Sequence, residues 1–422
     1  MATLVIQLGP WGILPRGPTR PILDRMARNS LFATLATLAL FACDAAEEDL
    51  DTELRSHHHV HHAHHGHHHG HGGHVGPKVD YIFPAEEWQI GTPEQHCLSS
   101  EGLAELAAIA EQTKSTCLVV IHDGVLVGDW YWDGYSAETP LPNVWSATKS
   151  VTNAVIGIAQ SEGLLDIHDP ASDYIPQWRE SASEDVTIFD LMTQTSGRQY
   201  DFLTDFGVLE QADQTAYSLG VGQDMDPGMR WEYSNTGTQA LEAVLEAAVG
   251  GDVGAYVRSR LFEPLGMTAT LAHDQAGNTL VYNGLSTTCQ DMARFGYLYL
   301  RDGRWNNQQI VPRIWIKKST QASTAFNDAY GYLWWLNKPG RVVLPSIPAR
   351  NEYDGKMFPS APDHMFMALG AFGQLIAVDP KDDIVLVRAT LDYDQTDPLA
   401  MGDMDAILGA LEDAKLSKHK CH

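Results

Sequence analysis

A serine and a lysine stand three residues apart, as Ser146-Ala-Thr-Lys149, at the head of a segment with helical periodicity. Residues three apart lie on one helix face, so this spacing places the lysine amine beside the serine hydroxyl. The first N–H groups of a helix lack intrahelical acceptors, which makes the amide of Ser146 a candidate donor to an oxyanion. The apolar positions that predict the helix are Ala147, Val151, Ala154, Val155 and Ile158.

A serine hydroxyl is a poor nucleophile at neutral pH, so a neighbouring group must accept its proton. Lys149 can do this if desolvation lowers its pKa, and the preceding Asn143-Val-Trp145 and the following Val151 favour an apolar setting. Tyr233, in Tyr233-Ser-Asn235, is the second candidate base, and we expect a nearby cationic lysine to make its phenol more acidic. Asn235 supplies an amide that can orient the lysine or a substrate. Ser146, Lys149 and Tyr233 are therefore the predicted catalytic residues.

Seven stretches of the chain, the Ser-x-x-Lys and Tyr-Ser-Asn motifs among them, resemble one known superfamily. It is that of the serine β-lactamases and penicillin-binding proteins, on the branch with class C β-lactamases, DD-peptidases, family VIII esterases and 6-aminohexanoate-dimer hydrolases. The resemblance runs from about residue 85 to about residue 411. The matching stretches are residues 118–127, 144–150, 186–197, 227–237, 261–267, 284–294 and 330–335.

The third motif of that superfamily, usually Lys-Thr-Gly or a form containing histidine, is where the sequence departs from the pattern. The best candidate is Gly370-Ala-Phe-Gly-Gln374, which contains neither lysine nor histidine. The resemblance links the missing basic residue to holding a substrate carboxylate, so its absence argues against penicillin recognition. Gly373 and Gln374 are expected to support the site, with a backbone N–H near Gln374 as second oxyanion donor.

The resemblance implies an α/β fold of the α+β type, β-lactamase/transpeptidase-like, with an antiparallel sheet flanked by helices and an inserted helical domain. We expect a catalytic domain at 85–415, with a sheet subdomain at 85–145 and 285–415 and a helical subdomain at 146–284. The active site would lie in the cleft between them. Tyr200 and Asp201 are candidates to line this cleft and meet a substrate amine.

Local patterns place several elements of this fold. Residues 102–113 show the periodicity of an amphipathic helix, and Asp123-Gly124 is a two-residue hairpin turn. Strands are expected near 330–336, 374–378 and 384–388, and a last helix carries apolar residues from Met404 to Leu411.

Three functions from different classes fit these residues. The first is a serine hydrolase that cleaves ester or amide bonds of small acyl compounds through an acyl-enzyme on Ser146. The second is a DD-peptidase or weak β-lactamase that acts on peptidoglycan-like substrates. The third is a catalytically silent surface lipoprotein that binds a ligand or a metal. The departure at Ala371 and Phe372 favours the first over the second, and retention of Ser146, Lys149 and Tyr233 argues against the third. No cofactor is expected.

The chain carries 28 basic and 54 acidic side chains, a formal charge of −26. Nucleic-acid binding requires clustered lysine and arginine, so this balance argues against it. The expected partner is a small ester or amide substrate. The sequence leaves the oligomeric state open.

The N-terminal segment 1–43 resembles an export signal. Met26-Ala-Arg28 is followed by twelve apolar or small residues and then Cys43, a pattern typical of a signal peptide and too short for a membrane span. Leu40-Phe-Ala-Cys43 resembles a bacterial lipobox, which implies a lipid anchor on Cys43 and a periplasmic or outer-membrane location. Met26 is a candidate start of translation.

The linker at 44–84 is acidic and rich in histidine. Twelve of the nineteen histidines lie between His57 and His74, a composition that cannot form a core. The imidazole groups of this tract are able to bind a transition-metal ion, but the sequence identifies no definite metal site among them. In an exported protein, Cys97 and Cys117 flank the predicted helix and could form a disulfide, although sequence does not fix the pairing. Cys289 is expected to be a small buried residue.

Overall fold

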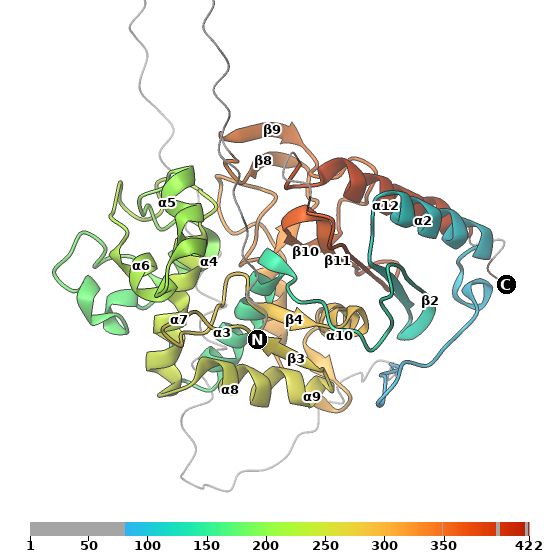
Figure 1. The fold of residues 1–422 in the computed structure, drawn as a ribbon, viewed down its shortest axis with the longest axis horizontal. Coiled ribbons are helices and arrows are strands. Elements are labelled where there is room, and N and C mark those ends of the chain that lie inside the picture. Colours follow the sequence, from blue (N-terminus) through green and yellow to red (C-terminus); the bar gives the residue numbers. More distant parts are fainter. Residues whose placement is uncertain (1–80, 348, 394–396, 418–420, 422) are drawn as a thin grey trace, which may run out of the picture. The chain divides into compact units, whose positions relative to one another are not determined.

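The computed structural model contains a six-stranded antiparallel sheet with the strand order β2-β1-β12-β11-β10-β7. Figure 1 labels β2, β10 and β11 of this sheet. Because β1 pairs with β12, the first hairpin is joined to strands from the far end of the chain. The expected fold class, an antiparallel sheet flanked by helices, is confirmed. The strands are β1 Cys117–His122, β2 Val125–Tyr131, β7 Trp335–Leu336, β10 Phe366–Gly370, β11 Gln374–Asp379 and β12 Ile384–Ala389.

The structure describes residues 81–347, 349–393, 397–417 and 421. Residues from Pro77 onwards form one compact unit. The predicted signal segment 1–43, with Cys43 and Met26, lies outside the described residues. So do the tract His57–His74 and most of the predicted linker 44–84.

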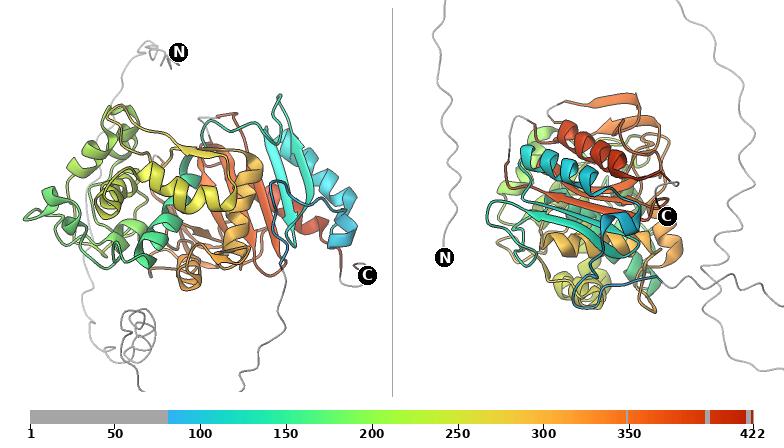
Figure 2. Two further views of the ribbon diagram at one scale, coloured as in Figure 1. Left: turned by 90° about the horizontal axis from the view of Figure 1, so that it is seen from below. Right: turned by 90° about the vertical axis from the view of Figure 1, so that its right-hand side faces the viewer.

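Alternate residues of β1 enter two different cores, as the two-residue period of a strand requires. Val119 and Ile121 pack into the core under helix α10 (Cys289–Leu300), whereas Leu118 and Val120 face the opposite core. Helices α2 (Ser100–Gln112) and α12 (Met401–Ala414) lie side by side over this second face (Figure 2). The sheet is therefore buried on both faces.

Two local predictions in this part are confirmed. Helix α2 begins after Ser99, whose Oγ accepts a hydrogen bond from the Gly102 amide, and its buried face is Leu103, Leu106, Ala107 and Ala110. Between β1 and β2, Asp123 has φ 51° and Gly124 has φ 80°, as a tight hairpin turn requires.

Between the first hairpin and the later strands the chain is mostly helical, with two short strands. These elements are η2 Trp145–Ala147, α3 Thr148–Ser161, η3 Ala171–Asp173, η4 Pro176–Trp178, α4 Ile188–Thr193, α5 Phe202–Phe206, η5 Gly207–Glu210, α6 Gln214–Gly220, α7 Asn235–Val249, α8 Val253–Val257, η6 Arg258–Phe262, α9 Glu263–Leu265, β3 Ala269–Leu271 and β4 Leu285–Thr287. The remaining elements are η1 Pro93–His96, β5 Arg304–Trp305, β6 Gln308–Gln309, α11 Arg313–Ser319, β8 Gly340–Leu344, β9 Asn351–Gly355 and η7 Ala371–Gly373.

The strand predicted over residues 330–336 is only partly correct. Leu333 adopts a left-handed backbone conformation, with φ 55°, which interrupts an extended run. Only Trp335–Leu336 therefore pairs in the sheet, as β7.

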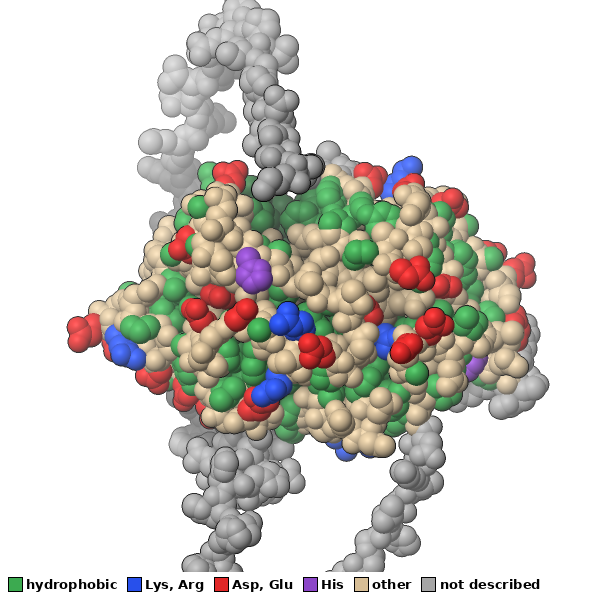
Figure 3. Space-filling model, turned by 60° about the horizontal axis from the view of Figure 1, so that its bottom comes forward, with side chains coloured by type: hydrophobic (Ala, Val, Ile, Leu, Met, Phe, Trp, Pro, Cys, Tyr) green, Lys and Arg blue, Asp and Glu red, His purple; other side chains and the backbone are tan. Residues whose placement is uncertain are grey.

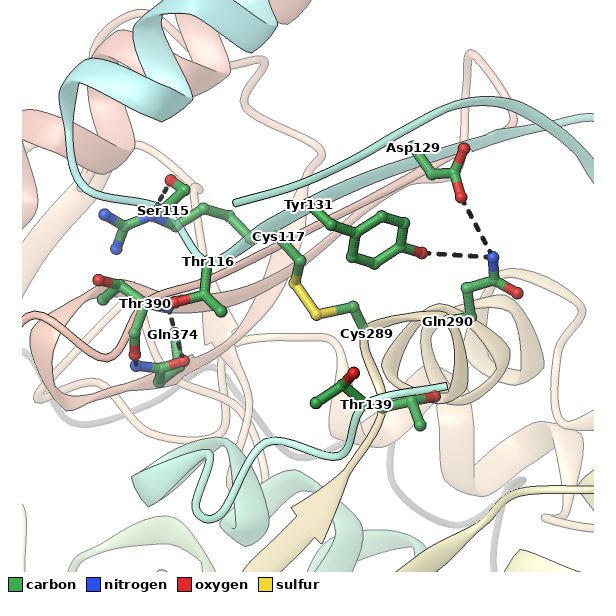
Figure 4. The surroundings of a disulfide bond; sticks show 12 residues. Ser115, Thr116, Cys117, Asp129, Tyr131, Thr139, Cys289, Gln290, Gln374 and Thr390 are labelled. Atoms are coloured by element: carbon green, nitrogen blue, oxygen red, sulfur yellow. Dashed lines mark hydrogen bonds between the residues drawn. A yellow bond between two sulfur atoms is a disulfide. The ribbon is translucent and has the colours of Figure 1, made fainter. Parts of the chain in front are cut away.

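The suggested pairing of Cys97 with Cys117 is wrong. The structure links Cys97 to Cys421 and Cys117 to Cys289, and Figure 4 shows the second bond joining β1 to α10. Helix α2 separates Cys97 from Cys117, and a 13-residue helix is about 20 Å long. A disulfide requires Cα atoms within about 7 Å, and Cys97 and Cys117 each meet this requirement with another cysteine, at Cα distances of 4.9 Å from Cys421 and 6.5 Å from Cys289.

Among the described residues, no helix combines the length and the apolar character that crossing a bilayer demands. Acidic side chains are spread over the face shown in Figure 3, with basic ones between them. Acidic and basic side chains are therefore mixed on this face.

Candidate active site

The backbone bends sharply immediately before Ser146. Trp145 has φ 52°, a left-handed conformation that costs a non-glycine residue about 1–3 kcal/mol. The Asn143 side chain holds this bend, because its Oδ1 accepts a hydrogen bond from the Trp145 amide at 2.6 Å. Ser146 follows as the second residue of the short helix η2, half-buried at the N-terminal side of α3. Such strain, held by specific contacts, is typical of functional sites.

Lys149 lies one turn further along, and its amine is buried with three hydrogen-bond acceptors. Nζ is 2.9 Å from Ser146 Oγ, 2.8 Å from Asn235 Oδ1 and 3.1 Å from the Tyr282 carbonyl oxygen. The predicted pairing of Ser146 with Lys149 is thus present as a direct contact. The Tyr282 carbonyl, a backbone group, could not be found from residue types.

Burial lowers the pKa of Lys149 from its usual 10.5 to about 7, while the charge of Asp205 raises it in part. The side chain is 1% exposed, so water cannot stabilise its ammonium form. A substantial fraction of this lysine is therefore neutral near pH 7, as a proton acceptor at this position must be.

Tyr233 is also brought to the site, but its phenol does not behave as expected. Burial raises the pKa of Tyr233, which outweighs the lowering by its hydrogen bond with the Ser146 side chain. The Lys149 amine lies over the ring, 4.8 Å from its centroid, and Trp335 stacks at a centroid distance of 5.7 Å. The expectation of a more acidic phenol is therefore wrong: desolvation by burial raises the pKa of Tyr233, the charge of Asp205 raises it further, and the hydroxyl keeps its proton at neutral pH.

Asp205 is a residue of this site that the sequence did not reveal. It is buried in α5, and its carboxylate accepts hydrogen bonds from the Asn235 amide at 2.7 Å and from Asn235 Nδ2 at 2.9 Å. Ser234 Oγ and the backbone and hydroxyl of Thr236 donate to it as well. Because Asp205 holds Nδ2 of Asn235, the Oδ1 atom of that amide must face Lys149.

The first residue of the predicted third motif, Gly370, ends β10 and lies against the segment that precedes Ser146. A Cβ atom on Gly370 would lie 2.3 Å from the carbonyl oxygen of Val144, so only glycine allows this strand to approach the segment before Ser146. Gly373, with φ 89°, and Gln374 lie further round the turn. The Gln374 side chain donates to the Thr390 carbonyl at 2.7 Å, as Figure 4 shows, which ties the start of β11 to the residue that follows β12.

Aromatic side chains contact one another at the turn of the predicted third motif. The Trp145 ring is 5.3 Å from that of Phe372 and 5.6 Å from that of Tyr393, with edge-to-face geometry. Arg388, on strand β12, contacts the same turn, and its Nη1 donates to the carbonyl oxygens of Phe372 and Gly373. This buried guanidinium is bound to backbone carbonyls, so it does not replace the missing cation.

Tyr200 and Asp201 are adjacent in the sequence, but their side chains contact different parts of the structure. Tyr200 lines a small pocket with Ser234 and Glu232, and its hydroxyl donates to the Ser346 carbonyl at 3.1 Å. Asp201 caps helix α5, since its carboxylate accepts hydrogen bonds from the amide and hydroxyl of Thr204. The structural role of Asp201 is thus to cap the N-terminus of the helix that carries Asp205.

Comparisons with known proteins agree with this architecture. The family model described as "Beta-lactamase" matches residues 103–404. The 6-aminohexanoate-dimer hydrolase of Paenarthrobacter ureafaciens is 22% identical over 334 residues, which are 70% of this chain and 79% of that protein.

Two solved structures show the same fold. One, from Bacillus anthracis, carries a provisional assignment as a 6-aminohexanoate-dimer hydrolase, with a TM-score of 0.63 and 20% identity, covering 80% of this chain and 91% of that one. The other is a family VIII carboxylesterase, with a TM-score of 0.56 and 16% identity, covering 77% of this chain and 98% of that one.

Proposed function

Because this chain belongs to the β-lactamase family, we propose that it is a serine hydrolase that cleaves ester or amide bonds of small acyl compounds. The acyl group would be carried on Ser146. The names of its relatives, a 6-aminohexanoate-dimer hydrolase and a carboxylesterase, support this class of reaction.

The observation that carries the proposal is the hydrogen bonding of the Lys149 amine. Two of its three acceptors, Asn235 Oδ1 and the Tyr282 carbonyl, can only accept. When the amine is neutral, its two N–H bonds are directed to these oxygens, so its lone pair faces Ser146 Oγ at 2.9 Å. This arrangement suits removal of the hydroxyl proton as the serine attacks.

The reaction would proceed by double displacement. Ser146 Oγ attacks the substrate carbonyl as its proton passes to Lys149, and the tetrahedral anion is stabilised by backbone N–H groups. The Ser146 amide at the start of its helix and a backbone N–H near Gln374 are the candidate donors. The leaving group takes a proton through the neutral phenol of Tyr233, and water then hydrolyses the acyl-enzyme.

The same geometry favours uncharged, apolar acyl substrates over β-lactams and peptidoglycan-like peptides. A carboxylate in the substrate would meet the aromatic cluster Trp145, Phe372 and Tyr393 instead of a cation. An apolar group gains from contact with these rings, whereas an unpaired carboxylate loses its hydration there.

Parallel turnover assays with p-nitrophenyl butyrate, 6-aminohexanoate dimer and nitrocefin test this function. We expect hydrolysis of one or both of the first two, with Ser146→Ala reducing it to background. Exclusive turnover of nitrocefin would contradict the proposed substrate class. Turnover that survives in Ser146→Ala would contradict the serine mechanism, and no turnover of any of the three would favour the ligand-binding lipoprotein.

We also propose that the protein is exported and anchored to a membrane by lipid on Cys43. The disulfides Cys97–Cys421 and Cys117–Cys289 support export, because such bonds persist in oxidising compartments. Metabolic labelling with a fatty acid, followed by mass analysis of the mature N-terminus, would find the lipid on Cys43. An unmodified or uncleaved N-terminus would contradict it.

A further inference from the structure

Two histidines and a carboxylate meet at the end of strand β1, where the first hairpin turns, outside the candidate active site. His96 ends the short helix η1, His122 ends β1, and Asp123 begins the hairpin turn. Asp123 Oδ2 is 3.0 Å from His122 Nδ1 and 3.7 Å from His96 Nδ1. One potential ligand atom from each residue lies within 4.8 Å of the other two.

Both Nδ1 atoms are buried and face the Asp123 carboxylate, which is at hydrogen-bonding distance from His122 Nδ1 but not from His96 Nδ1. A buried polar atom without a partner costs about 1–3 kcal/mol, so the His96 nitrogen needs an explanation. On its other side the His96 ring lies close to the backbone of Gly91, since a Cβ atom added to that glycine would be only 2.7 Å from Nε2. That glycine is itself joined to β2 through its amide, which donates to the Leu126 carbonyl. The Nδ1 atoms of both rings lie on the side that faces the Asp123 carboxylate.

The spacing suits a transition-metal ion. Ligand atoms about 2.0–2.1 Å from Zn²⁺ in tetrahedral geometry lie roughly 3.3 Å apart, which falls between the two nitrogen–oxygen distances of this cluster. Imidazole nitrogen and carboxylate oxygen are both ordinary zinc ligands. Arg301, the cation beside the turn, is paired with Asp383 through both of its terminal nitrogens, which limits its repulsion of a bound ion.

We propose that His96, His122 and Asp123 form a binding site for one Zn²⁺ ion, with the fourth position taken by water. The ion would join η1 to the β1–β2 hairpin, next to the disulfide of Cys97. It would thereby fix the segment that leads into the sheet. The site uses none of the residues proposed for hydrolysis, so an experiment that rejects the metal site does not reject the hydrolase function, and the reverse also holds.

The test uses the full-length chain with the histidines between His57 and His74 replaced by serine, because that tract could bind metal by itself. Zn²⁺ is titrated into this background by calorimetry against a competing chelator, and the thermal midpoint is measured with and without the ion. We expect one equivalent to bind and to raise the midpoint.

Replacement of a ligand should weaken this binding at least tenfold and abolish the rise in the midpoint, in both His122→Asn and Asp123→Asn. The matched control is His364→Ala, which removes a partly buried histidine that also faces carboxylates, Asp363 and Asp379. It should bind Zn²⁺ as the background does, as should Ser146→Ala. Circular dichroism confirms that each variant is folded.

Two results would overturn the site. One is a background chain that binds no Zn²⁺ at about 0.1 mM. The other is a folded His122→Asn chain that binds it as tightly as the background. If His122→Asn does not fold, the Asp123→Asn chain decides, since its side chain lies half in solvent and its loss leaves both histidines in place.

Discussion

Replacing Lys149 with methionine tests whether this lysine is held neutral inside the folded protein. A lysine with a pKa of about 7 when folded and 10.5 when unfolded leaves the unfolded chain with more bound proton between these two values. Stability must therefore rise with pH across this window in the wild type. The methionine variant lacks the group, so its stability should lack this rise.

The magnitude follows from the same two values. Each pKa unit corresponds to about 1.4 kcal/mol, so the full window is worth about 5 kcal/mol and the interval from pH 7 to pH 9 about 2 kcal/mol. Relative to Lys149→Met, the free energy of unfolding of the wild type should increase by this amount between pH 7 and pH 9. Loss of the base should also reduce turnover by about 10²- to 10⁴-fold.

Urea unfolding of both proteins at the two pH values measures the difference. Titrating groups that do not interact with Lys149 cancel because both proteins share them, whereas Asp205 interacts with Lys149 directly and contributes to the difference. Lys317→Met, at an exposed position of α11, is the matched control and should show the pH dependence and turnover of the wild type. An equal stability difference at pH 7 and pH 9 would refute the claim that burial keeps Lys149 neutral.

Three other substitutions should separate the roles of the neighbouring groups. Tyr233→Phe keeps the ring under the Lys149 amine but removes the hydroxyl, so turnover should fall about 10²- to 10³-fold; the pH midpoint of kcat should stay near 7, and its loss would identify the phenol as the base. Asp205→Asn places an amide against Asn235 Nδ2 and removes a charge that raises the pKa of Lys149. The kcat should therefore fall, and the midpoint of its pH dependence should move to lower pH. A shift of this midpoint to higher pH would be inconsistent with this geometry. Cys289→Ala opens a cross-link that spans 172 residues, worth about 5 kcal/mol in the chain-entropy description; the urea midpoint should drop accordingly, and an unchanged midpoint would show that the bond is not formed.

Local patterns predicted the parts of the fold that depend on neighbouring residues. The apolar stripe of α2, the Asp123-Gly124 turn and the one-turn spacing of Ser146 and Lys149 are all set by short-range geometry. The predicted helix after Ser146 also forms, although Ser146 itself lies in the short helix η2 before α3.

Features that depend on distant contacts could not be predicted in this way. Asp205 lies in a five-residue helix with no motif around it, and only the fold places its carboxylate under Asn235. The Tyr282 carbonyl is a backbone acceptor that any residue type could provide. The pKa of Tyr233 was expected to fall because the lysine is close, but the sequence does not report how completely the phenol is buried.

The central claim is that Ser146 is the nucleophile and Lys149 the group that activates it. The most direct measurement is the rate at which a fluorophosphonate labels the chain between pH 5 and pH 9, with the modified peptide identified by mass spectrometry. We expect a single label on Ser146, a labelling rate that rises with a midpoint near pH 7, and labelling at least 100-fold slower in Lys149→Met. A label on another residue, or a rate that Lys149→Met leaves unchanged, would contradict this claim.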